Sequence, residues 1–161
     1  METTVRAYCT ADLSAMREIW NAVVEDGLYF PQTEPLSEQE AAAFFKEQSF
    51  CGVAEREGEV IGLYTIGRCG HIANASYAVK ASARGNHVGG GRRWCATASP
   101  PGGSWAFCIL QQNDVVKTNY GAIHLYEKLG FVPLGTIPGG FRQKDDRGDR
   151  YEDIVLFCHT L

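Results

Sequence analysis

The spacing of apolar residues in the first third of the chain predicts two amphipathic helices. One set recurs every three or four residues and comprises Leu13, Met16, Ile19, Trp20 and Val23. Thr10 or Asp12 can cap this helix, which should end near Gly27. Ser37-Glu38-Gln39-Glu40 is a capping box, so a second helix should continue through Phe45. The aromatic segment Tyr29-Phe30-Pro31 lies between them, and a short strand is expected over Thr4–Tyr8.

Beyond the second helix the pattern changes to the alternation that is typical of strands. The expected strands are Phe50–Glu55, Glu59–Ile66, His71–Val79, Phe107–Gln111, Phe131–Leu134 and Tyr151–His159. Arg56-Glu57-Gly58 should turn the first two into a hairpin, and Lys144–Arg150 should form an exposed turn between the last two. Thr118 should cap a further helix that ends at Gly130. The pattern therefore predicts an α/β protein.

Size and composition indicate a single domain over residues 1–161. The chain has 161 residues, 45% hydrophobic and 21% charged, which suits one core. A net charge of −4 with interspersed signs argues against a nucleic-acid partner. The six cysteines are scattered, without the spacing of a metal site or of a disulfide framework. The N-terminal residues are charged, unlike those of a signal peptide, and no apolar run is long enough to span a membrane. We therefore expect a cytoplasmic protein without a metal site or membrane contact.

A glycine-rich turn follows the predicted strand that ends at Val79. Its residues are Ser82, Ala83, Arg84, Gly85, Asn86, His87, Val88, Gly89 and Gly90. Such a turn can present backbone N–H groups to a phosphate, which suggests a nucleotide-bearing ligand. Glycines in this pattern can equally serve a tight connection with positive φ, so the turn alone leaves both interpretations open.

The order of the predicted elements and two motifs resemble the GCN5-related N-acetyltransferase (GNAT) family over nearly the whole chain. Arg84-Gly85-Asn86-His87-Val88-Gly89-Gly90 resembles the pyrophosphate loop of that family, and Asn119 with Leu125–Phe131 resembles its second signature. His87 departs from the pattern, because a glycine usually stands there. The resemblance implies a GNAT fold, with a twisted, mixed but mostly antiparallel sheet of six or seven strands and helices on both faces.

This resemblance also implies a cosubstrate and a set of site residues. Acetyl-CoA would be held through its diphosphate by Arg84, Gly85, Asn86, His87, Val88, Gly89 and Gly90. The strand ending at Val79 and the strand Phe107–Gln111 should splay apart to admit pantetheine, with a backbone N–H near Val79 for the oxyanion. Tyr126 matches the tyrosine that protonates the departing thiolate, although a tyrosine on an apolar helix face is also a normal core residue. His71, Glu34 or a water chain could act as the base.

Three asparagines resemble those of the proline-analogue (azetidine-2-carboxylate) N-acetyltransferases. By this similarity Asn74 and Asn113 bind a small amino-acid-like substrate, and Asn119 contacts acetyl-CoA. Structural amides at a strand irregularity explain Asn74 and Asn113 equally well. Phosphinothricin-type acetyltransferases resemble the overall layout nearly as closely, and Tyr29, Phe30 and Tyr64 could line the amine pocket.

Residues 91–105 do not match the long helix that this fold should carry after the loop. Pro100-Pro101-Gly102-Gly103 forbids a helix through that point, so only a short, distorted helix over about Gly90–Ala98 is expected. Codons for residues 92–107 read one base out of register can spell an amphipathic helix. Paired frameshifts bounded near Gly90 and Ala106 are therefore a hypothesis that an intact mass can test.

Taken together, the sequence predicts an N-acetyltransferase that transfers acetyl from acetyl-CoA directly to the amino group of a small molecule, such as an amino acid or a toxic analogue. The alternative is a catalytically silent acyl-CoA-binding or regulatory protein on the same fold, favoured if residues 91–105 are genuine. The expected partners are a small-molecule amine and, as in many relatives, a second copy of the chain in a homodimer.

Overall fold

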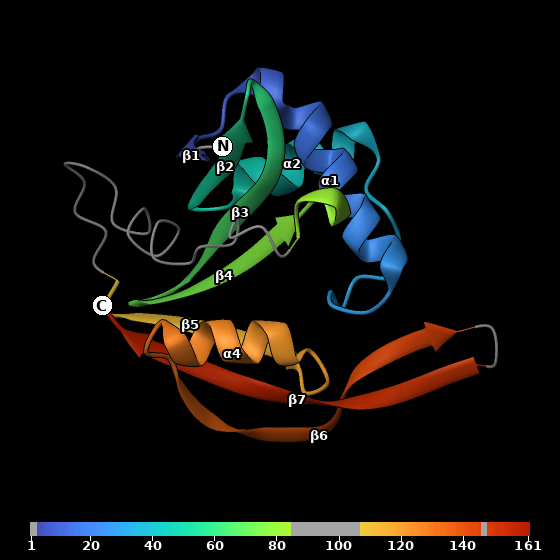
Figure 1. Cartoon of the computed structure of the whole chain (residues 1–161), viewed down its shortest axis with the longest axis vertical. Helices are drawn as coiled ribbons and strands as arrows, with labels where there is room; N and C mark the ends of the chain where they lie inside the picture. Colours follow the sequence, from blue (N-terminus) through green and yellow to red (C-terminus); the bar gives the residue numbers. More distant parts are fainter. Residues whose placement is uncertain (1–2, 85–106, 146–147) are drawn as a thin grey trace.

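The computed structural model describes residues 3–84, 107–145 and 148–161 (Figure 1). The glycine-rich loop predicted over Gly85–Gly90 lies outside the described residues, and so does the anomalous segment 91–105. The roles assigned to that loop, the short helix and the frameshift hypothesis therefore stay predictions.

The described strands form one sheet in the order β1-β2-β3-β4-β5-β7-β6. They are β1 (Thr4–Ala7), β2 (Phe50–Arg56), β3 (Glu59–Cys69), β4 (Ile72–Val79), β5 (Ile109–Val116), β6 (Val132–Asp145) and β7 (Gly148–Thr160). β4 and β5 are parallel, and every other described pair of neighbouring strands is antiparallel. The prediction of a mixed, mostly antiparallel sheet is confirmed.

Helices cover both faces of this sheet (Figure 1). The described helices are α1 (Leu13–Asp26), α2 (Glu38–Glu47) and α4 (Tyr120–Lys128), with short 3-10 turns at Thr10–Asp12 and Ala81–Ala83. Trp20 of α1 and Phe45 of α2 pack in one buried cluster with Leu63 of β3. Tyr64, the next residue of β3, belongs to a second cluster, against which Ile123 of α4 packs. Neighbouring strand residues point to opposite faces, so β3 contributes to both cores. None of the described helices is both long and apolar enough to span a bilayer.

The predicted stop of the first helix and the predicted start of the second are confirmed, whereas Asp12, at the N-cap of α1, makes no side-chain capping hydrogen bond. Gly27 follows α1 with φ of 64°, a left-handed conformation that glycine adopts without steric cost. The Ser37 hydroxyl accepts from the Glu40 backbone N–H at 3.3 Å, and the Ser37 backbone N–H donates to Glu40 Oε2 at 2.9 Å. This reciprocal pair is the capping box that the sequence predicts at the start of α2.

Several boundaries in the second half of the chain were predicted wrongly. β5 continues to Val116 instead of ending at Gln111, because a shift in its register against β7 accommodates the extra residues. β6 extends to Asp145, where a strand of four residues was expected, and register shifts against β7 absorb its glycines and prolines. Asn119, not Thr118, caps α4. The β6–β7 turn is correspondingly shorter than Lys144–Arg150.

An ion-pair cluster fastens the edge strand β1 to the start of α1. Arg6 Nη1 and Nη2 donate to the two carboxylate oxygens of Asp12 at 2.7 and 2.9 Å, and Arg6 also bonds Glu55 of β2. Asp12 is buried and accepts from the Cys9 backbone N–H at 2.8 Å. The hydrogen bonds from Arg6 hold the pKa of Asp12 well below its usual value.

Replacing Asp12 by Asn should lower the free energy of unfolding by about 2 kcal/mol, because it removes a charge-assisted hydrogen-bonded pair. Since the pKa of Asp12 is depressed in the folded state, its stabilisation is complete above about pH 5 and is lost as the pH falls through the folded pKa. Urea titrations at pH 7 and at pH 3 should therefore show a smaller gap between wild type and Asp12→Asn in acid.

Asp149→Asn is the matched control, because Asp149 forms an exposed pair with Arg142 at 2.8 Å. It should change stability by about 0.5 kcal/mol or less. Equal losses in the two variants at pH 7 would contradict the special role of Asp12.

Candidate functional site

β4 and β5 part soon after they begin to pair (Figure 1). Their parallel ladder joins Ile72–Asn74 to Ile109–Gln111, whereas β4 continues to Val79 and β5 to Val116. On its other side, β4 stays paired with β3 as far as Val79. The edge of β4 beyond Asn74 is therefore not covered by β5, and the predicted splay is confirmed.

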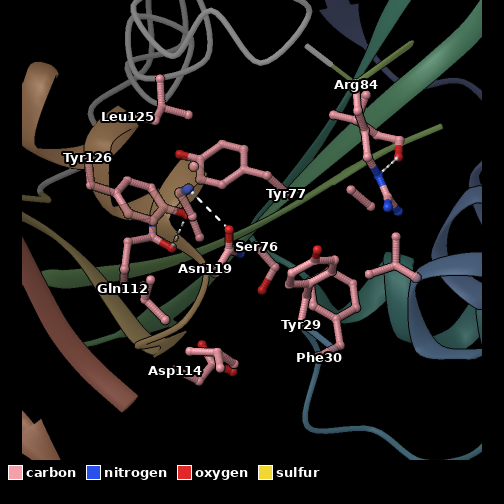
Figure 2. A pocket seen from close by; sticks show the side chains of 18 of the residues that line it. Tyr29, Phe30, Ser76, Tyr77, Arg84, Gln112, Asp114, Asn119, Leu125 and Tyr126 are labelled. Carbon is pink, nitrogen blue, oxygen red and sulfur yellow. Dashed lines mark hydrogen bonds between the residues drawn. The ribbon is translucent and has the colours of Figure 1, made fainter. Parts of the chain in front are cut away.

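A cavity of about 700 Å³ lies between the diverging strands. Its walls come from β4, β5, α4, the segment after β4 and the loop after α1. Figure 2 shows Tyr126 and Gln112 across the cavity from Tyr29 and Phe30. Arg84 and Asp114 lie far apart in the same view. The cavity is therefore elongated, with different chemistry at its two ends.

An irregularity in β5 decides which of its polar side chains reach the cavity. The register against β7 runs from Gln112 opposite Phe157 to Val115 opposite Val155, so β5 contains one residue more than its partner. Gln112 and Asp114 line the cavity, while Asn113 between them is exposed. Val115 and Val116 complete the same wall.

Tyr126 stands with its ring in the core and its hydroxyl toward Gln112. The ring centroid lies 5.4 Å from that of Phe131 and 5.8 Å from that of Phe157. The hydroxyl donates to Gln112 Oε1 over 3.4 Å, a long and therefore weak hydrogen bond. Gln112 Nε2 is buried and has no hydrogen-bond partner among the described residues. The long hydrogen bond and the unpartnered Nε2 leave the Gln112 amide able to change its partner when a ligand enters.

Asp114 is a partly buried carboxyl group in the cavity wall. Burial removes water from the carboxylate and raises its pKa above the usual value. No described residue forms an ion pair with it. A carboxylate in this situation binds a cation or accepts a proton more readily than one in water.

Arg84, at the other end of the cavity, is held by three contacts. Its Nη2 pairs with Asp26 Oδ2 at 3.0 Å, and its Nε donates to the Val79 carbonyl at 3.3 Å. The guanidinium carbon also lies 5.7 Å from the centre of the Tyr29 ring. Arg84 thus joins the end of β4 to α1 and to the aromatic loop, immediately before the predicted phosphate-binding loop.

The three predicted asparagines lie in different surroundings. Asn74 Nδ2 donates to the Gln111 carbonyl at 3.3 Å, within the stretch where β4 and β5 still pair. Neither Asn74 nor Asn113 lines the cavity, whereas Asn119 does. Asn119 Oδ1 accepts from the Ala122 backbone N–H at 3.2 Å, which makes Asn119 the N-cap of α4. The ligand contacts predicted for these asparagines stay predictions.

Of the other predicted site residues, some line the cavity and some do not. Val79, Arg84 and Tyr126 line the cavity, as do Tyr29 and Phe30, whereas Tyr64 is buried in the core. His71 and Glu34 are exposed and do not line it. Within the described ranges, no group of three or more His, Cys, Asp or Glu side chains is placed to hold a metal ion.

Gln112 and Asp114 line the cavity but were not predicted as site residues. The predicted strand ended at Gln111, and of the three polar residues that follow only Asn113 was assigned to a ligand. The signal was the pair of valines at 115 and 116, which shows that an apolar run resumes after Asn113 and Asp114. Polar residues enclosed by apolar strand positions are candidates for a buried site.

The comparisons with known proteins agree with this geometry. The model of the acetyltransferase (GNAT) family matches residues 14–131. A GCN5-related N-acetyltransferase from Kribbella flavida is 30% identical, with a TM-score of 0.81 over 99% of this chain and 98% of that one. An N-acetyltransferase from Staphylococcus aureus Mu50 is 22% identical, with a TM-score of 0.86 over 99% of both chains. No curated protein sequence matches.

A phosphinothricin acetyltransferase from Sinorhizobium meliloti, solved in complex with AcCoA, has a TM-score of 0.84 at 23% identity. The match covers 100% of this chain and 89% of that one, and at this identity it shows the fold. The chain belongs to the acetyltransferase (GNAT) family, which makes it an acetyl-CoA-dependent N-acetyltransferase.

Asn119→Ala should lower the free energy of unfolding by about 1 kcal/mol, because it removes the side-chain cap of α4. Asn119→Asp keeps an acceptor oxygen at the N-cap and should stay within about 0.5 kcal/mol of wild type. Urea denaturation of both variants without ligand measures the cap apart from any contact with acetyl-CoA. Equal destabilisation of the two would contradict the capping role.

Proposed function

We propose that the protein transfers an acetyl group from acetyl-CoA directly to the amino group of a small molecule, in the cavity between β4 and β5. The parting of these strands is the observation that carries this assignment, because it leaves a strand edge beside an enclosed space. Acetyl-CoA supplies the activated thioester. The homodimer stays a prediction.

The residues along the cavity fit an elongated cosubstrate. Main-chain groups of β4 beyond Asn74 can pair with an extended, amide-bearing arm as a neighbouring strand would. Arg84 leads into the loop predicted to bind the diphosphate, so the phosphate end of the ligand belongs at the Arg84 end of the cavity. The thioester end then lies toward Tyr126 and Gln112.

Tyr126 is proposed to give its hydroxyl proton to the sulfur as the C–S bond breaks. Its ring is fixed between Phe131 and Phe157, which directs the hydroxyl into the cavity at little entropic cost. The bond to Gln112 is weak enough to be exchanged for one to the ligand. A backbone N–H near Val79 is proposed to stabilise the oxyanion, because Val79 lies in the uncovered stretch of β4.

Tyr126→Phe should lower kcat about 100-fold while KM for acetyl-CoA changes less than about threefold, since only the proton donor is lost. Release of CoA thiol in the presence of a panel of amines measures the rate, on protein whose intact mass matches the printed sequence. The control is Tyr120→Phe, because Tyr120 lies on the same helix but is 74% exposed and does not line the cavity.

The same measurements distinguish the transferase from the alternative, a catalytically silent acyl-CoA-binding protein. Acetyl-CoA that raises the melting temperature while no amine releases thiol would support that alternative. Thiol release at equal rates by wild type and Tyr126→Phe would leave the transferase intact and contradict the role of Tyr126.

A further inference from the structure

Resting on the proposed function, we propose that Asp114 binds the acceptor as an ammonium ion and takes its proton. The acceptor is then a cationic alkylamine with an apolar substituent and without a carboxylate beside the amine. This assigns a role to a residue outside the matched motifs and narrows the class of substrate.

The position of Asp114 in the cavity supports this role. Asp114 shares the cavity with Ser76, Gln112 and Tyr126, and Figure 2 shows it far from Arg84. If the diphosphate lies at the Arg84 end, Asp114 lies where the acceptor must enter. Its carboxylate has no described ion-pair partner of its own and is available to a cation. Its raised pKa makes it a better proton acceptor than an exposed carboxylate.

The positive charges around the cavity argue against an α-amino acid as the acceptor. Among the described lining residues, the permanently charged cations are Arg84 and Lys128. Arg84 is paired with Asp26, and Lys128 ends α4, about 12 Å along the helix axis from its start. Lys117, near Asp114 in sequence, is paired with Asp153 at 3.0 Å. An α-carboxylate bound beside the amine would therefore face Asp114 without a described cation to balance it.

The wall opposite Gln112 and Tyr126 suits an apolar substituent. Tyr29 and Phe30 are partly buried there, and the Phe30 ring centroid lies 4.4 Å from that of Trp20. Trp20 is itself buried and lines the cavity, so it supports the position of Phe30. Aromatic faces bind hydrocarbon and also attract a nearby ammonium group.

The transfer balances with Asp114 and Tyr126 in these roles. One proton passes from the ammonium nitrogen to Asp114, and the freed lone pair forms the N–C bond to the acetyl carbon. The C–S bond then breaks, and sulfur takes the proton of Tyr126. The nitrogen loses its second proton to the Tyr126 oxygen, and Asp114 releases its proton to solvent.

The test compares a cationic amine with one acceptor that adds a carboxylate and another that lacks the ammonium charge. Wild type, Asp114→Asn and the control Glu127→Gln are assayed by thiol release with 2-phenylethylamine, phenylalanine and aniline. 2-Phenylethylamine is cationic at neutral pH, phenylalanine adds a carboxylate, and aniline is a neutral amine. Glu127 is exposed on α4 and does not line the cavity, so its variant controls for a general change in charge.

Wild type should prefer 2-phenylethylamine to phenylalanine by about 100-fold in kcat/KM, the effect of leaving a buried charge unbalanced. Asp114→Asn should lose about 100-fold on 2-phenylethylamine and less than about threefold on aniline, which carries no ammonium proton for Asp114 to remove. Glu127→Gln should match wild type. Asp114→Asn should also raise the melting temperature by a few degrees, because a desolvated carboxylate is removed.

Equal losses on 2-phenylethylamine and aniline, no loss on either, or a preference for phenylalanine would each overturn this assignment while leaving the transferase in place. A wild-type protein that binds acetyl-CoA and acetylates none of these or any other amine would overturn the proposed function as well.

Discussion

The site depends on one constraint: the strands β4 and β5 hydrogen-bond to each other at one end and separate at the other. β4 is paired with β3 as far as Val79 but with β5 only as far as Asn74. Beyond Asn74, one edge of β4 therefore faces a cavity instead of a strand. Main-chain groups at such an edge need partners when water is excluded. An extended ligand that carries amide groups would supply them, which is the role proposed here for acetyl-CoA.

The extra residue in β5 places polar side chains in the wall of the cavity between β4 and β5. It places Gln112 and Asp114 in the wall and leaves Asn113 exposed. Tyr126 approaches from α4, and Tyr29 and Phe30 approach from the loop after α1. A phenol group and a carboxyl group therefore lie along one cavity, as the proposed transfer from a thioester to an ammonium ion requires.

Local signals predicted most of the fold, and long-range pairing accounts for what they missed. The capping box at Ser37 and the glycine stop at Gly27 act within a few residues, so the sequence shows them directly. β6 was predicted far too short, because its glycines and prolines are tolerated only through register shifts against β7. Tyr126 and Arg84 followed from motifs, whereas Asp114 lines the cavity through an irregularity in the pairing with β7, of which the sequence shows only the apolar run that resumes at Val115.

Hydrogen–deuterium exchange with and without saturating acetyl-CoA tests the central claim, that the uncovered edge of β4 receives the acyl carrier. Peptides that cover residues 75–79 should exchange more slowly with acetyl-CoA, because their main chain gains hydrogen-bond partners. Peptides from the paired part of β6 and β7 should not change. Binding that leaves residues 75–79 unprotected, while slowing exchange elsewhere in the sheet, would contradict the account.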